Sequence, residues 1–255
     1  MRAPRILVHA FPGFLGLPGD LDFLAPHLRE IRGCPVEWRI SLVDPAESEG
    51  WEAWTQRWLK ENPATEGCRE VLLGYSLGGR AAVHLAAAAP ERFRGLVAIS
   101  TNPGLTQDWE RLQRLAADEA WARRFEEENW RELLEAWDSQ PAFGGSALPD
   151  RLKGRARFGD DEFRGRCIRQ LRGLSLGRQA DLAPRLASLE IHQAWMTGER
   201  DLRFTEFARR LGEGSKIRRV VVPLAGHRWP WELGESEAAA WVARALEKMT
   251  EELPQ

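Results

Sequence analysis

The sequence predicts an α/β protein in which a mostly parallel sheet carries helices on both faces and a helical lid is inserted. Strand-like and helix-like segments alternate up to about Gly104, and they alternate again from residue 183 onward. Strands that alternate with helices pair in parallel through right-handed crossovers. Between these parts, residues 105–182 contain no strand-like pattern. We therefore expect residues 1–104 and 183–255 to form the core and residues 105–182 to form the lid.

In the first part of the core, short apolar runs predict four strands. A helix rich in alanine follows the third run and is expected to end before Pro90, because proline cannot continue a helix. The expected strands are residues 6–8, 36–43, 71–73 and 96–100, and the expected helix is residues 80–89.

The middle segment is charged and rich in tryptophan, and its apolar residues recur at helical spacing, as Leu112, Leu115 and Phe125 do. Residues 141–149 are expected to form a loop within it. After this segment we expect strands at 194–197 and 220–222 and a closing amphipathic helix at 235–249.

The segment Gly74-Tyr75-Ser76-Leu77-Gly78 matches the pattern G-x-S-x-G and lies between a predicted strand and a predicted helix. This pattern resembles the nucleophile elbow of the α/β-hydrolase fold, in which a sharp turn exposes the serine above the sheet. The pattern predicts Ser76 as the reactive serine and the Leu77 N–H as one oxyanion donor. The second donor is expected from the loop after the first strand, where Gly13 would let the Phe14 N–H face Ser76.

A serine hydroxyl needs a neighbouring base, and in this fold the chain order is serine, acid, histidine. His227 follows the predicted strand at 220–222, and Asp201 follows the strand before it. We therefore predict Asp201 as the acid that orients His227. Glu199 is the next candidate and Asp181 the third.

Composition excludes several classes of protein. Basic residues number 36 and acidic residues 38, which argues against a nucleic-acid binder. No apolar stretch is long enough for a membrane span or a signal peptide. The three cysteines have no metal-ligand or disulfide spacing, so no metal site is expected. We expect a cytoplasmic protein that is a monomer or a small homo-oligomer and does not bind membranes.

Beyond the elbow, the chain resembles the 2-succinyl-6-hydroxy-2,4-cyclohexadiene-1-carboxylate synthases of menaquinone and phylloquinone biosynthesis. The resemblance runs through most of the chain. It rests on the motifs Gly74-Tyr75-Ser76-Leu77-Gly78-Gly79-Arg80, Ser100-Thr101-Asn102-Pro103-Gly104-Leu105, Arg111, Arg114, Asp118, Trp121, Ala122, Phe125, Trp137, Gln140-Pro141, Phe143, Leu174-Ser175, Gly177, Gln179, Asp181-Leu182, Gly198-Glu199-Arg200-Asp201 and Ala225-Gly226-His227.

The resemblance implies a lyase that works without a cofactor: the triad abstracts a proton from an anionic cyclohexene substrate, and pyruvate is expelled. It also implies a substrate pocket with Tyr75, Trp137 and arginines that bind carboxylates. Arg80 and Arg114 match two of these arginines. Arg157 is our choice for the third, with Arg164 as the alternative.

Two loops depart from the family pattern. Pro12-Gly13 stands where the family usually has His-Gly, and residues 44–50 replace the family's loop after its third strand. The alternatives to the lyase are a serine hydrolase that cleaves a carboxylic ester or a C–C bond in a small anionic substrate, and a receptor built on the same fold.

Overall fold

The computed structural model describes residues 5–143, 161–211 and 216–249. Its centre is a seven-stranded sheet in the order β2-β3-β1-β4-β5-β6-β7. All neighbouring strands pair in parallel except β2, which is antiparallel to β3. The strands are β1 (Arg5–Phe11), β2 (Glu30–Ile31), β3 (Cys34–Ile40), β4 (Cys68–Tyr75), β5 (Phe93–Ile99), β6 (His192–Gly198) and β7 (Ile217–Val222).

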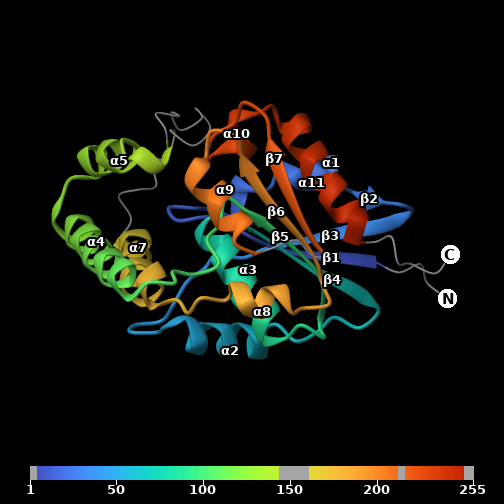
Figure 1. The fold of residues 1–255 in the computed structure, drawn as a ribbon, viewed down its shortest axis with the longest axis horizontal. Coiled ribbons are helices and arrows are strands. Elements are labelled where there is room, and N and C mark those ends of the chain that lie inside the picture. Colours follow the sequence, from blue (N-terminus) through green and yellow to red (C-terminus); the bar gives the residue numbers. More distant parts are fainter. Residues whose placement is uncertain (1–4, 144–160, 212–215, 250–255) are drawn as a thin grey trace.

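Helices cover both faces of this sheet (Figure 1). One face carries α2 (Trp51–Glu61), α3 (Leu77–Ala88) and α8 (Ala183–Ala187), and the other carries α1 (Leu24–His27) and α11 (Glu235–Met249). The short helices α9 (Leu202–Arg209) and α10 (Trp229–Glu232) follow β6 and β7. The predicted α/β fold is confirmed.

The central strands are buried on both faces, as expected for strands between two helical layers. In β1 the side chain of Val8 belongs to the apolar cluster beneath α11, whereas Phe11 packs in the cluster beneath α2 and α3. This alternation explains why β1 and β4 appear in the sequence as nearly continuous apolar runs.

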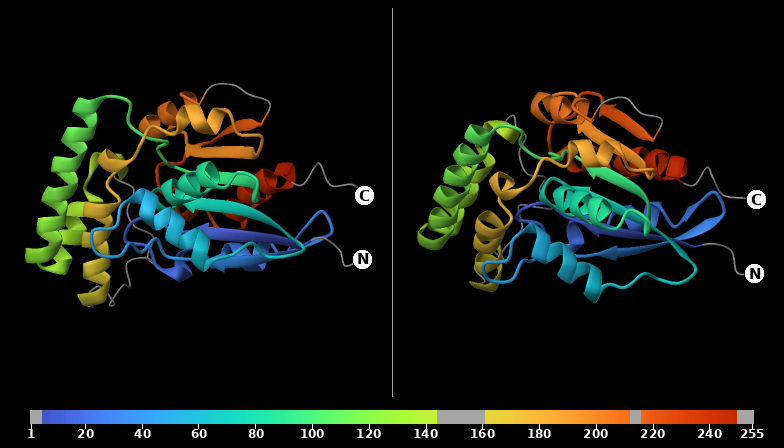
Figure 2. Two further views of the ribbon diagram at one scale, coloured as in Figure 1. Left: turned by 90° about the horizontal axis from the view of Figure 1, so that it is seen from below. Right: turned by 60° about the horizontal axis from the view of Figure 1, so that its bottom comes forward.

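Three helices from the middle of the chain lie together beyond one end of the sheet (Figure 2). We call α4 (Asp108–Glu127), α5 (Trp130–Asp138) and α7 (Asp161–Gly173) the helical segment. They share an apolar cluster that includes Phe125, Leu133 and Cys167, and Leu15 of the loop after β1 also belongs to it. Among the described residues, none between 100 and 191 lies in a strand. The lid role of this segment and the domain limits stay predictions.

Polar contacts join α7 to two loops of the core. Arg166 donates to the Gly16 carbonyl oxygen at 2.9 Å, in the loop after β1. Arg169 donates to the Pro45 carbonyl oxygen at 2.8 Å and to the Asp44 carboxylate at 2.9 Å, in the loop after β3. The loop that departs from the family pattern is therefore a support for α7.

Several elements differ from the expectation, among them strand β2 and helices α1, α9 and α10, which were not predicted. Helix α2 was not predicted, although Trp51, Trp54, Thr55 and Trp58 are its buried residues and recur at helical spacing. Strand β3 ends at Ile40 rather than at residue 43. The Ser41 N–H still donates to the Ala10 carbonyl oxygen of β1 at 2.9 Å, and further along the chain the Val43 carbonyl oxygen accepts a hydrogen bond from Gln170 of α7.

Candidate active site

Ser76 lies at a strained turn between β4 and α3. Its backbone has φ 52° and ψ −109°, a conformation that residues with a side chain rarely adopt. The turn depends on two close backbone approaches: a Cβ atom on Gly74 would overlap the Gly78 carbonyl, and one on Gly78 would overlap the Phe11 carbonyl. The glycines of the motif are therefore required by sterics.

The turn is also fixed by hydrogen bonds. Ser76 N–H donates to the Ile99 carbonyl oxygen at 2.9 Å, and the Thr101 hydroxyl donates to the Ser76 carbonyl oxygen at 2.7 Å. Leu77 is the first residue of α3 and is buried. The serine is thus held by the neighbouring strand, as a strained residue must be.

Asp201 and His227 form a buried pair. Asp201 Oδ2 lies 2.8 Å from His227 Nδ1, and the two side chains are 4% and 3% exposed. Asp201 directly precedes α9, and its N–H donates to the Gly198 carbonyl oxygen at 3.0 Å. The ring nitrogen not facing Asp201 is Nε2, the atom that would exchange a proton with a serine.

The other candidate acids bind elsewhere. Glu199 accepts a hydrogen bond from the Leu224 N–H at 2.8 Å. Asp181 pairs with Arg210 at 3.0 Å. Of the three carboxylates considered, Asp201 is the one that bonds His227.

The loop that carries His227 is held by Glu232, which the sequence analysis did not single out. Its carboxylate accepts from the Gly226 N–H at 2.6 Å and from the Arg228 N–H at 3.2 Å. These two amides flank His227 in the chain, so one carboxylate fixes the backbone on both sides of the histidine. A carboxylate five residues after a candidate histidine gives no recognisable sequence pattern.

Aromatic rings enclose the imidazole. The ring centroids of Phe204, Tyr75 and Phe143 lie 4.4, 5.5 and 5.7 Å from that of His227. Tyr75 also packs edge-on against Trp231 at 4.5 Å. This apolar surrounding keeps water from the ring and strengthens its interaction with Asp201.

A cavity of about 140 Å³ brings these groups together. Ser76 and His227 both line it, but among the described residues no hydrogen bond joins the Ser76 hydroxyl to the His227 ring. The other predicted residues that line it are Phe14, Tyr75, Arg114 and Trp137. Leu77 and Arg80 are not in its wall.

Phe14 and Trp137 form the contact between the core and the helical segment at this cavity. Their ring centroids lie 4.5 Å apart, and Phe14 also packs edge-on against Phe125 at 5.5 Å. The Phe14 side chain is therefore part of the apolar contact between core and helices. The roles of the Phe14 and Leu77 N–H groups as oxyanion donors stay predictions.

Arg114 keeps most of its hydrogen-bonding capacity. Its Nε donates to both carboxylate oxygens of Asp118, at 2.8 and 2.9 Å. In the described part of the chain, its two terminal NH₂ groups donate to no protein atom. A guanidinium held through Nε can donate from these groups to a carboxylate, and the substrate-binding role of Arg114 stays a prediction.

Arg80 points to the base of the helical segment. Its Nη1 donates to the Leu174 carbonyl oxygen at 2.9 Å, and its guanidinium lies 5.1 Å from the Trp51 ring centroid. Burial, and then the positive charge of Arg114, lowers the pKa of Arg80 to about 9. The residue still carries its charge at neutral pH, but its substrate-binding role stays a prediction.

Of the two candidates for a third arginine, Arg157 lies outside the described residues. Arg164 donates to the carbonyl oxygens of Phe125 and Glu128 and lies over the Trp130 ring at 4.6 Å. These contacts join α7 to the turn between α4 and α5. Arg164 is not in the wall of the cavity.

A cation that the sequence analysis missed is Arg228, which is 5% exposed and lines the cavity. It pairs with Asp138 at 2.5 Å, and its guanidinium lies 3.9 Å from the Phe143 ring centroid. Its position next to a candidate catalytic histidine was the available sequence clue.

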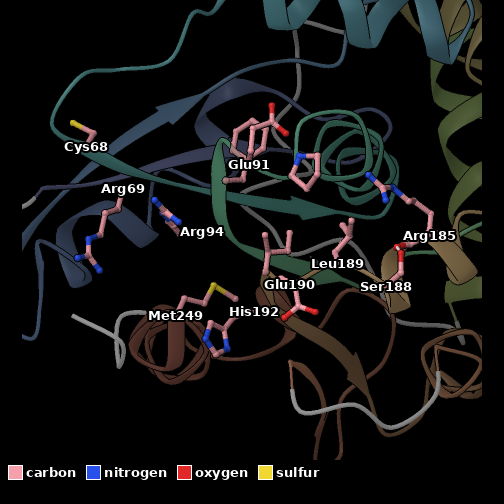
Figure 3. A pocket seen from close by; sticks show the side chains of 13 residues that line it. Cys68, Arg69, Glu91, Arg94, Arg185, Ser188, Leu189, Glu190, His192 and Met249 are labelled. Atoms are coloured by element: carbon pink, nitrogen blue, oxygen red, sulfur yellow. Dashed lines mark hydrogen bonds between the residues drawn. The ribbon is translucent and has the colours of Figure 1, made fainter. Parts of the chain in front are cut away.

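A larger hollow of about 690 Å³ lies at the opposite end of the sheet and contains none of the predicted site residues. Figure 3 shows Arg69 and Arg94 on one side of it and Arg185 on the other. Glu91 and Glu190 also line it. Its charges are dispersed and of both signs, so geometry favours the smaller cavity as the active site despite its size.

The chain matches a protein-family model over most of its length. The model described as "Alpha/beta hydrolase family" matches residues 2–245. The chain belongs to the alpha/beta hydrolase family. Among solved structures, MenH from S. aureus superposes with a TM-score of 0.79, covering 98% of this chain and 96% of that chain at 20% identity. At that identity the likeness supports the fold alone.

Within this family, the chain is similar to one group of curated proteins. The chain is 35% identical over 160 residues to the 2-succinyl-6-hydroxy-2,4-cyclohexadiene-1-carboxylate synthase of Serratia proteamaculans. This match spans 61% of the chain and 60% of the relative's length, less than two thirds of either. The synthase of the same name from an Enterobacter species is 31% identical over 184 residues, which cover 72% of the chain and 69% of the relative. The predicted resemblance to this group is confirmed.

Among the described residues, no helix combines the length and hydropathy that a membrane crossing requires. The same residues contain no group of three or more His, Cys, Asp or Glu side chains placed to bind a metal ion. Cys34, Cys68 and Cys167 form no disulfide.

Proposed function

We propose that this protein is a lyase that eliminates pyruvate from an anionic cyclohexene intermediate of menaquinone biosynthesis. The observation that carries the proposal is one cavity lined by Ser76, His227 and Arg114. His227 can accept a proton there, and Arg114 can bind a carboxylate of the same substrate. The names of the curated relatives support the same activity.

In the proposed mechanism, Ser76 and His227 remove a proton from a ring carbon of the substrate. The electrons of that C–H bond form a new C=C bond while the C–O bond to the enolpyruvyl group breaks. The leaving enolate takes up a proton and departs as pyruvate. Asp201 stabilises the positive charge on His227 and fixes its tautomer.

The N–H groups of Phe14 and Leu77 are proposed to stabilise negative charge on the substrate oxygen, as preorganised donors do. The helical segment is proposed to act as a lid, with Trp137 in its cavity-facing surface. We further propose that the protein needs no cofactor and works in the cytoplasm on a small anionic substrate.

The strained Ser76 favours one alternative. A serine at such an elbow can attack a carbonyl and form an acyl-enzyme, which would make the protein a hydrolase of small anionic esters or C–C bonds. The lyase reaction requires no covalent intermediate, so the two activities differ in what becomes attached to Ser76.

The test is to incubate the protein with the pathway intermediate and follow pyruvate with lactate dehydrogenase. We expect turnover that Ser76→Ala lowers about a thousandfold or more. An exposed control, Arg209→Gln, should leave the rate unchanged. If pyruvate is absent and p-nitrophenyl acetate acylates Ser76, as mass spectrometry would detect, the hydrolase is correct.

A further inference from the structure

Arg228 provides a second cation in the wall of the proposed active site. It follows His227 directly, is almost fully buried and lines the same cavity as Ser76. Its guanidinium lies against the Phe143 ring at 3.9 Å, which limits its orientations. A buried guanidinium in a ligand cavity is costly unless an anion accompanies it.

Among the described residues, Asp138 is an anion that accompanies Arg228, and it also lines the cavity. Arg228 Nη2 lies 2.5 Å from Asp138 Oδ1, and the side chains are 6% and 26% exposed. Asp138 is the last residue of α5, whereas Arg228 belongs to the core. The pair therefore crosses the cavity wall between two parts of the chain.

The pair differs from the other arginine–aspartate pair at the cavity. Arg114 and Asp118 are four residues apart on one helix, so their contact is local. Arg228 and Asp138 are 90 residues apart, and their contact depends on how α5 lies against the core. The second pair can separate without unfolding a helix, and a ligand carboxylate fits the guanidinium as Asp138 does.

We propose that Arg228 binds a carboxylate of the substrate and that Asp138 holds the place of that carboxylate until the substrate arrives. Arg114 and Arg228 then bind two carboxylates of one polycarboxylate. This inference rests on the proposed function for the identity of the substrate. It makes Arg228 a determinant of specificity, and it makes Asp138 a competitor of the substrate.

The two substitutions are expected to have opposite effects. Arg228→Gln removes the charge and should raise KM for the substrate about 10- to 150-fold, with little change in kcat. Asp138→Asn removes the competing charge and should lower KM about three- to tenfold, because binding no longer includes the cost of displacing Asp138. Arg228→Lys should recover only part of the affinity, because lysine lacks the planar guanidinium that binds both oxygens of a carboxylate.

Binding of succinate separates this inference from the proposed activity. Fluorescence titration with succinate needs no turnover, and Trp137 in the cavity wall is the expected reporter. We expect Arg228→Gln to weaken succinate binding, Asp138→Asn to tighten it and Arg209→Gln on the surface of α9 to leave it unchanged. Thermal unfolding of each variant checks that it is folded.

The outcomes are distinct. Opposite shifts in succinate affinity without pyruvate release support the carboxylate site and contradict the lyase. Pyruvate release with both substitutions weakening binding overturns the inference, because a structural contact predicts equal losses from either partner. Succinate affinity that neither substitution changes, or no succinate binding by the unsubstituted protein, also overturns it.

Discussion

Asp201→Asn removes the negative charge beside His227 and keeps the size of the side chain. In the structure this charge lies 2.8 Å from His227 Nδ1, and both side chains are at most 4% exposed. When His227 accepts a proton, the two charge centres are about 4 Å apart, and their attraction at an effective dielectric constant of about 20 is about 4 kcal/mol. Loss of that stabilisation lowers kcat about a thousandfold.

The assay is pyruvate release at saturating substrate, compared with Glu199→Gln. That control removes the other candidate carboxylate, whose partner is the Leu224 N–H and not His227. We expect the control to retain activity within about threefold, in line with the small effects of most exposed substitutions. A loss at Glu199 that equals or exceeds the loss at Asp201 would refute the assignment of the acid.

Three further predictions concern charges. Arg114→Gln should raise KM for the anionic substrate about 10- to 150-fold and leave hydrolysis of neutral p-nitrophenyl acetate unchanged; equal losses would make the residue structural. Glu232→Gln should lower kcat about tenfold at constant KM in the same pyruvate assay, because it loosens the backbone around His227; an unchanged kcat would contradict this. Burial alone would raise the pKa of Glu70, but hydrogen bonds from His9, the Thr65 N–H and Arg92 outweigh it and lower the pKa to about 2. Glu70→Gln should therefore cost about 3 kcal/mol of unfolding free energy in urea at pH 7. That difference should fall as the pH drops below about 4.5 towards 2, and a constant difference would contradict the reasoning.

The sheet was predictable because its central strands are apolar on both faces, and the elbow because sterics restrict Gly74 and Gly78. Asp201 could be ranked first because the fold fixes where the acid follows a strand, and the structure places it against His227. Helix α2 was missed although its tryptophans show helical spacing.

Contacts between distant residues were not predictable. Arg80 was expected in the substrate pocket, but the carbonyl oxygen to which it donates belongs to Leu174, 94 positions along the chain. Arg228 could not be ranked as a site residue, because its partner Asp138 lies 90 positions away in the chain. Local sequence patterns do not indicate where the helix that carries Asp138 packs. The choice between Arg157 and Arg164 had the same difficulty, since arginines are frequent in the middle of the chain.

The separate apolar cluster of the helical segment has a consequence for evolution. Phe125, Leu133 and Cys167 belong to a cluster distinct from the two beneath the sheet, and it meets one of these at Phe14. Substitutions at distant sites that share no contacting residue usually have additive effects on stability. Side chains of the helical segment that line the cavity can therefore vary during evolution while Ser76, Asp201 and His227 keep their positions. Substrate specificity can then change without a change in the catalytic residues.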